Sequence, residues 1–165
     1  METTPRVSVA AGFASLLLVL VCINALGWLT ARHLSLPAPW ADGFGVGLAL
    51  LALLGLLLVM GVLHVLNPDL ARKYGPLAAL VPVASGMLLV FPFTVLALIA
   101  ELVLHWSAAQ AFATAGVMTG AAAIGMETGR LGSARLANSL VPSIAGGLFV
   151  AAWMLTNALL PAVIR

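Results

Sequence analysis

A carboxylate and an imidazole four residues apart, Glu101 and His105, are the side chains in this chain best suited to do chemistry. On a helix this spacing places both groups on one face. Such a pair can share a proton, bind a cation or hydrogen-bond a ligand. Three further polar residues, His33, Gln110 and Asn157, fall near the same end of the predicted helices. We therefore expect a ligand- or ion-binding site around these residues. The competing interpretation is that the pair is interfacial, hydrated and structural.

A second acidic group, Glu127, follows a run of small residues at helical spacing: Ala109, Ala113, Gly116, Gly120 and Ala123. Small residues let membrane helices approach closely, and Gly-x-x-x-Gly is the usual form of this pattern. Arg130 lies three residues after Glu127, which is a pairing distance on a helix. We predict that Gly116, Gly120, Glu127 and Arg130 form a helix-packing face with an ion pair. A proton relay through Glu127 is the alternative.

Metal and cofactor sites are not indicated. The three histidines, His33, His64 and His105, include no pair at metal-ligand spacing, and no Cys-x-x-Cys-His sequence occurs. The alternate glycines from Gly43 to Gly47 lack the strand and the spacing of a dinucleotide-binding loop. We expect Gly43 and Gly47 to make close helix contacts instead. The sequence thus predicts no metal, no cofactor and no catalytic residue.

These polar groups belong to a chain that is overwhelmingly apolar. Of its 165 residues 63% are hydrophobic and 7% are charged, whereas soluble domains have roughly 45–50% and ~25%. Charges are absent from five long windows, each longer than the roughly 20 residues that cross a bilayer as a helix. The apolar runs do not alternate, so a barrel is excluded and helices remain.

The predicted fold is therefore an all-α integral membrane protein with five transmembrane helices, short loops and no soluble domain. The whole chain, residues 1–165, forms one transmembrane domain. The expected spans are residues 8–30, 43–66, 77–104, 107–128 and 138–163. Pro37 and Pro39 predict an extended connector before the second span, and Pro68 is expected to end it, because proline cannot continue a helix.

Orientation follows from the distribution of lysine and arginine between the two sides of the membrane. The side of the N-terminus carries five cations and the other side two. Because cationic loops stay in the cytoplasm, we predict an N-in, C-out topology in a cell membrane of the bacterial inner-membrane type. Of the four tryptophans, Trp28, Trp40 and Trp106 fall at the outer ends and Trp153 in the outer half. This bias indicates an outer binding rim or is a chance distribution.

Two functions from different classes fit this chain. The first is a non-catalytic membrane subunit of a larger transport or energy-transducing complex, which suits the absence of catalytic motifs and the small-residue helix face. The second is a small homo-oligomeric channel or carrier with an outer polar site at Glu101 and His105. An enzyme would need more inward-facing polar groups. The expected partners are the lipid bilayer and other membrane subunits or further copies of the chain, and no nucleic acid, since the seven cations are dispersed.

Overall fold

The computed structural model describes residues 9–74, 78–104, 106–131 and 136–163, and this part of the chain is helical without strands. The helices are α1 (Val9–His33), α2 (Ala38–Leu66), α3 (Pro68–Tyr74), α4 (Leu80–Val103), α5 (Trp106–Leu131) and α6 (Ala137–Val163). Within the described ranges, five of them, all but the short α3, are long and apolar enough to cross a membrane. The predicted five-span helical architecture is confirmed.

The extended connector predicted before the second span is wrong. The second span begins at Ala38 rather than at residue 43, because Pro39 lies in the first turn of α2. Pro68 does end α2, but it also begins α3 at once. Proline is well tolerated at the start of a helix, where its missing N–H would have had no partner. Between the two helices, the backbone N–H of Asn67 donates to the carbonyl of Leu63 and closes the last turn of α2.

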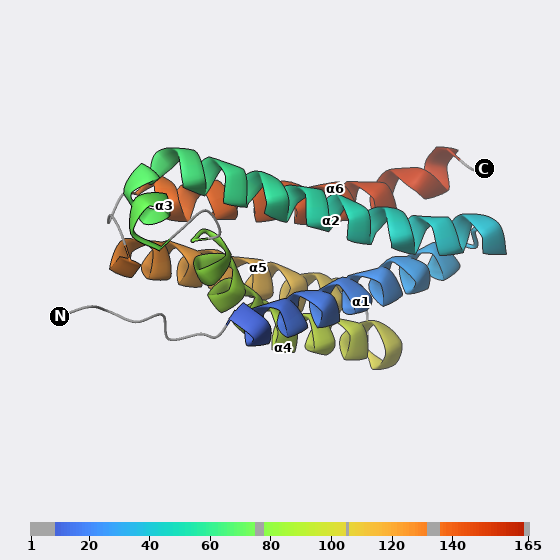
Figure 1. Cartoon of the computed structure of the whole chain (residues 1–165). Helices are drawn as coiled ribbons and strands as arrows, with labels where there is room; N and C mark the ends of the chain where they lie inside the picture. Colours follow the sequence, from blue (N-terminus) through green and yellow to red (C-terminus); the bar gives the residue numbers. More distant parts are fainter. Residues whose placement is uncertain (1–8, 75–77, 105, 132–135, 164–165) are drawn as a thin grey trace.

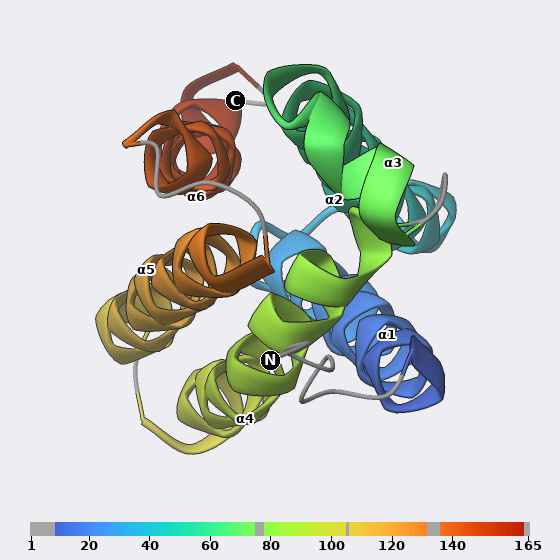
Figure 2. The ribbon, with the colours of Figure 1, turned by 60° about the vertical axis from the view of Figure 1, so that its left-hand side comes forward.

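The five spanning helices form a ring. Around it the order of packing is α1, α2, α6, α5, α4 and back to α1, which Figure 2 shows nearly end-on. From the side, α2 and α6 form one layer, while α1, α4 and α5 form the other (Figure 1). We call the end that carries α3 the α3 end, and the opposite end the Glu101 end. α1 begins toward the α3 end, and α6 ends at the Glu101 end.

The most extensive helix contact, between α4 and α5, depends on glycine. A β-carbon on Gly116 would come within 2.7 Å of Phe93 Cβ, and one on Gly120 would collide with Val90. From the other side, a β-carbon on Gly86 would meet Ile124 Cγ1 at 2.5 Å. The helices therefore approach more closely than any larger residue would allow at these three positions.

The contact between α1 and α2 also depends on glycine, but at a position other than those expected. A β-carbon on Gly27 would lie 2.8 Å from Gly45 Cα, and one on Gly45 would lie 2.6 Å from the carbonyl oxygen of Asn24. Gly43 and Gly47 have no other atoms within 4 Å of such a carbon. The expectation of close contacts at Gly43 and Gly47 is wrong within the chain, because the helix turns Gly45 alone toward α1.

Candidate functional site

An apolar, partly open cavity of about 130 Å³ lies between the helices of the ring. All five spanning helices contribute to its wall, and Thr94 supplies the one side-chain hydroxyl of the lining. That hydroxyl donates a 2.7 Å hydrogen bond to the carbonyl of Phe91 on its own helix. The wall therefore offers almost no polar group to an occupant. An engineered apolar cavity of about 150 Å³ in another protein stays dry and binds benzene or xenon.

Trp153 bounds this cavity toward the Glu101 end. Its side chain, 2% exposed, packs in one apolar cluster with Leu26, Ala97, Ala100 and Ala109, which come from α1, α4 and α5. The three alanines leave room for the large indole, which extends from α6 across the ring. This arrangement, here called the Trp153 layer, separates the cavity from the polar end. Trp153 is thus a core residue and does not belong to an interfacial rim.

A second apolar cluster bounds the cavity toward the α3 end. It contains Val59 and Leu63 of α2 and Ile124 of α5, with Val141 and Ala145 of α6 packed against them. Val59, Ile124 and Ala145 also line the cavity. The cavity therefore lies between two packed apolar layers near the middle of the bundle.

Helical spacing carries the cavity-facing stripe of three helices past the Trp153 layer to polar residues. On α4 the stripe runs from Val90 and Thr94, which line the cavity, through Ala97 to Glu101. A step of three or four residues stays on one helix face, so Glu101 continues the stripe. Its carboxylate thus lies at the end of the cavity-facing side of α4.

The same spacing holds on the other two helices. On α6, Asn157 follows Trp153 by four residues, and on α1, His33 follows the buried Thr30 by three. Thr30 itself accepts a hydrogen bond of 3.3 Å from Trp153 Nε1. His33 is exposed, yet it lies close enough to Glu101 for a Coulombic interaction. Three helices therefore end their inward faces at the same end of the ring with a carboxylate, an amide and an imidazole.

Two oxygen atoms at this end lack hydrogen-bond partners. In the described part of the chain, Glu101 Oε2 and Asn157 Oδ1 are the only buried side-chain nitrogen or oxygen atoms without one. Asn157 Nδ2 donates to the carbonyl of Trp153 at 2.8 Å, which turns the amide oxygen away from the helix backbone. Gln110 is half-buried, and His105 lies outside the described residues.

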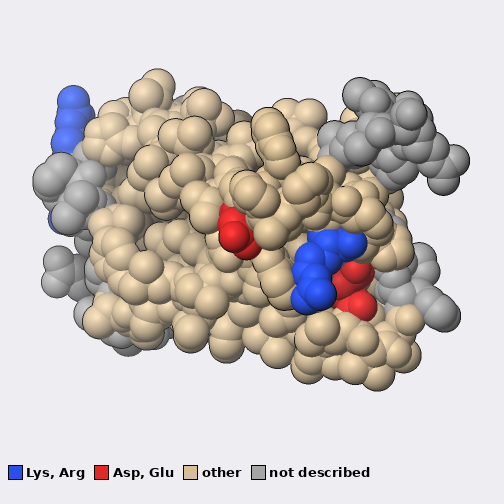
Figure 3. Space-filling view, turned by 90° about the vertical axis from the view of Figure 1, so that its right-hand side faces the viewer, with Lys and Arg blue, Asp and Glu red and all other residues tan. Residues whose placement is uncertain are grey.

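The surface at the Glu101 end carries little charge. Figure 3 views this end and shows one acidic patch by itself, basic atoms next to a second acidic patch beside it, and further basic atoms at one edge, among mostly uncharged side chains. The guanidinium of Arg32 lies 4.7 Å from the centre of the Trp28 ring, where a cation–π contact holds it.

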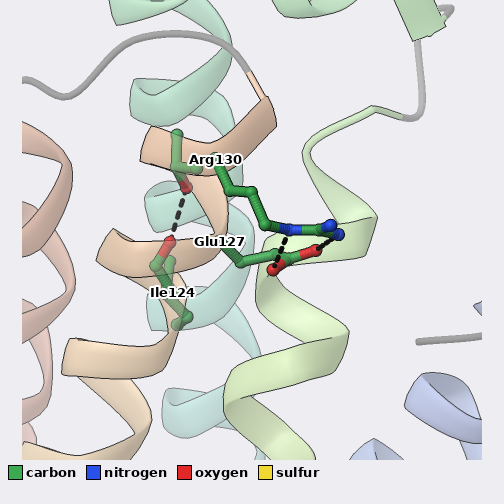
Figure 4. A network of polar contacts seen from close by, with 4 residues as sticks. Ile124, Glu127 and Arg130 are labelled. Carbon is green, nitrogen blue, oxygen red and sulfur yellow. Dashed lines mark hydrogen bonds and ion pairs between the residues drawn. The ribbon is translucent and has the colours of Figure 1, made fainter. Parts of the chain in front are cut away.

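The α3 end contains the predicted ion pair. Arg130 Nη2 lies 2.6 Å from Glu127 Oε1, and Arg130 Nε donates to Glu127 Oε2 at 3.0 Å, a two-pronged contact visible in Figure 4. The Glu127 side chain is 10% exposed. Thr128, beside it, donates to the carbonyl of Ile124 at 2.6 Å. Both carboxylate oxygens of Glu127 accept hydrogen bonds from Arg130 on the same helix. The pair therefore stabilises the end of α5.

Sequence reasoning missed the polar pair next to this ion pair. Asn67, at the end of α2, donates from Nδ2 to Asn138 Oδ1 at 2.8 Å, and Asn138 Nδ2 donates back to Asn67 Oδ1 at 3.4 Å. Both amides are buried. The sequence pattern that indicates this contact is the position of each asparagine at the end of a predicted span, on the same side of the membrane.

Metal ligation has no geometric support in the described ranges, where no three His, Cys, Asp or Glu residues lie close enough to hold an ion. His64 is exposed near the α3 end of α2, and His33 lies at the other end of the bundle. No known protein family, curated protein or solved structure matches the chain. The function has to be argued from the cavity and its polar end.

Proposed function

We propose that this chain is a multi-pass membrane protein that binds and carries a small apolar molecule in the cavity of its helix ring. The observation behind the proposal is that all five spanning helices line one apolar cavity between two packed layers. The cavity volume of about 130 Å³ suits an occupant of the size of one aromatic ring. A cavity lined by every spanning helix is a property of the whole fold.

The character of the wall narrows the channel-or-carrier hypothesis to a carrier of apolar molecules. An ion or a polar solute would lose its hydration in this cavity, and burying an unpaired charge or polar group costs several kcal/mol or more. The Thr94 hydroxyl, already bonded to Phe91, offers little compensation. An apolar molecule has no hydration to lose on entering the cavity, and it gains contacts with the apolar side chains of the wall.

A glycine in the wall supplies a direct test. Gly55 lines the cavity, and a β-carbon built there meets no other atom within 4 Å. Gly55→Leu should therefore fill the cavity without disturbing the fold. Gly61→Leu is the matched control, because Gly61 lies on the same helix with equally open space but outside the cavity wall.

The probe is fluorobenzene, followed by ¹⁹F NMR with the purified chain in lipid nanodiscs. We expect a saturable bound signal in the wild type and in Gly61→Leu, and its loss in Gly55→Leu. Empty nanodiscs give the signal of fluorobenzene dissolved in lipid. Equal saturable binding by Gly55→Leu and the wild type, or no binding above that of lipid alone, would overturn the proposal.

A second candidate is a non-catalytic subunit of a larger transport or energy-transducing complex. The supporting observation is the outward face of α2, where Gly43 and Gly47 form a Gly-x-x-x-Gly pair with open space in front of them. Such a pair suits the close approach of a helix from another protein or another copy. Partner proteins should then co-purify in mild detergent and be lost in Gly47→Leu. They should be retained in Gly147→Leu, whose site is an equally open glycine of α6.

The cation distribution supports an orientation in a cell membrane of the bacterial inner-membrane type. With the N-terminus in the cytoplasm, the α3 end faces inward and the Glu101 end faces outward. The polar residues beyond the Trp153 layer are then the first groups that a molecule from outside meets.

A further inference from the structure

The two unpartnered oxygens at the Glu101 end share one chemical property: each accepts hydrogen bonds. Glu101 Oε2 and Asn157 Oδ1 are both buried without a donor among the described residues. Leaving such an acceptor unpaired is unfavourable, and more so for a charged group. The two residues come from α4 and α6, which are separated in the ring by α5. On both helices they follow the cavity-facing stripe beyond the Trp153 layer.

The orientation of the Asn157 amide is fixed by a hydrogen bond to its own helix. Asn157 is held by the bond from its Nδ2 to the carbonyl of Trp153, and this carbonyl can accept only from the nitrogen of the amide. The oxygen is therefore the atom presented to the end of the ring. Glu101 is half-buried in the last turn of α4. The arrangement is a pair of buried acceptors, an amide oxygen with a fixed orientation and an oxygen of a carboxyl group.

We propose that Glu101 and Asn157 form a recognition site for the ammonium group of a small amine. An ammonium supplies several N–H donors from one compact cation, which matches a carboxylate and an amide oxygen. Two oxygens are too few for calcium, which takes six to eight, and no three-residue metal cluster exists among the described residues. His33 lies close enough to Glu101 for a Coulombic interaction but supplies no hydrogen bond to Oε2, and the Arg32 guanidinium lies over the Trp28 ring.

This inference rests on the proposed function for the size of the ligand's apolar part. A molecule that reaches the outer site and continues to the cavity has to fit about 130 Å³, which suits one aromatic ring. Because burial of a charge in the apolar cavity is costly, the charged amine binds at the outer site, and it passes the Trp153 layer only after its proton has been released to water. An arylalkylamine such as benzylamine, protonated near neutral pH, combines both properties.

The experiment compares three ligands of similar body by calorimetric titration of the nanodisc-embedded chain at neutral pH. Benzylammonium carries both charge and N–H donors, benzyl alcohol has a donor without the charge, and benzyltrimethylammonium has the charge without N–H donors. We expect benzylammonium to bind at least about tenfold more tightly than either analogue, since a hydrogen bond to a charged group contributes that much or more. Equal affinities for benzylammonium and benzyl alcohol would overturn the proposal.

The variants locate the site. Glu101→Gln should weaken benzylammonium binding by about tenfold or more, and Asn157→Leu should weaken it several-fold. Asp42→Asn is the matched control: it removes one carboxylate from the same end, but at an exposed position of α2. Affinity in Glu101→Gln equal to that in Asp42→Asn contradicts the proposal, as does a failure of benzylammonium to bind the wild type.

Fluorobenzene binding separates this inference from the proposed function. If Glu101→Gln loses benzylammonium but still binds fluorobenzene, the variant is folded and the outer site is established. If the wild type binds fluorobenzene but not benzylammonium, the cavity proposal stands and the ammonium site is wrong. If benzylammonium binds through Glu101 while fluorobenzene does not bind, the outer site stands and the cavity proposal fails.

Discussion

Trp153 Nε1 of α6 donates a hydrogen bond to Thr30 Oγ1 of α1 at 3.3 Å, across the interior of the helix ring. The two helices are not neighbours in the ring, so the indole bridges it. Both residues are almost completely buried. This single contact joins the large side chain that bounds the cavity to the helix that carries His33. It therefore couples the packing of the Trp153 layer to the polar end.

Trp153→Phe should destabilise the protein. The substitution removes the N–H donor and leaves space around the shortened ring, so the loss should be ~1–3 kcal/mol from the unpaired Thr30 hydroxyl together with a cavity cost. The measurement is thermal denaturation in detergent followed by circular dichroism. Trp40→Phe, at an exposed position, is the control and should leave the melting temperature unchanged.

The double variant Trp153→Phe/Thr30→Val separates hydrogen bonding from packing. Valine matches threonine in shape and removes the hydroxyl, so the double variant should be less destabilised than the sum of the two single variants. Strict additivity would show that the bond between the indole and the hydroxyl contributes nothing to stability.

The spans and the local pairs could be predicted from the sequence, because both depend on residues close together in the chain. Uninterrupted apolar windows determine spanning helices, and a spacing of three brings Arg130 to Glu127. The contacts between Asn67 and Asn138 and between Thr30 and Trp153 join residues 71 and 123 positions apart. Membrane helices are apolar on nearly every face, so hydrophobic periodicity does not reveal which face turns inward. The ring order, the cavity and these long-range hydrogen bonds therefore cannot be predicted from the sequence.

Part of the candidate site was accessible for the same reason. His33, Glu101 and Asn157 lie near matching ends of the predicted spans. Position along a span gives depth in the membrane, so the sequence predicts that they lie at one level. That they continue the inward stripes of their helices depends on helix rotation, which only the structure shows. The sequence does not reveal the start of α2, because proline occurs both in the first turn of a helix and in an extended connector.

Glu127→Gln should cost far more stability than the loss of a surface pair. The Glu127 side chain is 10% exposed and holds Arg130 at two points, so its neutralisation leaves a partly buried guanidinium with weakened partners. Breaking a buried pair costs ~3–5 kcal/mol, and partial exposure reduces this figure to about half. The matched control is Asp69→Asn, which removes the exposed partner of Arg72, 3.8 Å away, and should change stability by less than ~1 kcal/mol. Equal, small losses in both variants, measured by chemical denaturation, would show that the Glu127 pair is merely solvated.

Gly120→Leu should disrupt the contact between α4 and α5. A β-carbon at this position already collides with Val90, so a leucine forces the helices apart and sacrifices the close packing at Gly86 and Gly116. We expect a fall in melting temperature and in folded yield. Gly47→Leu adds the same atoms where the structure has open space, and should leave the isolated chain as stable as the wild type. Unchanged stability in Gly120→Leu would count decisively against the tight crossing.

The topology predicts opposite accessibility for two aspartates. Asp42 lies in the first turns of α2 and Asp69 in α3, at the two ends of the bundle, and both are exposed. Each is replaced by cysteine in a Cys22→Ala background, so no cation that directs insertion is altered. With an impermeant maleimide on intact cells, position 42 should react from outside, and position 69 only after the membrane is permeabilised. The reverse pattern would place the Glu101 end in the cytoplasm. It would then require that any molecule bound by Glu101 and Asn157 arrives from inside.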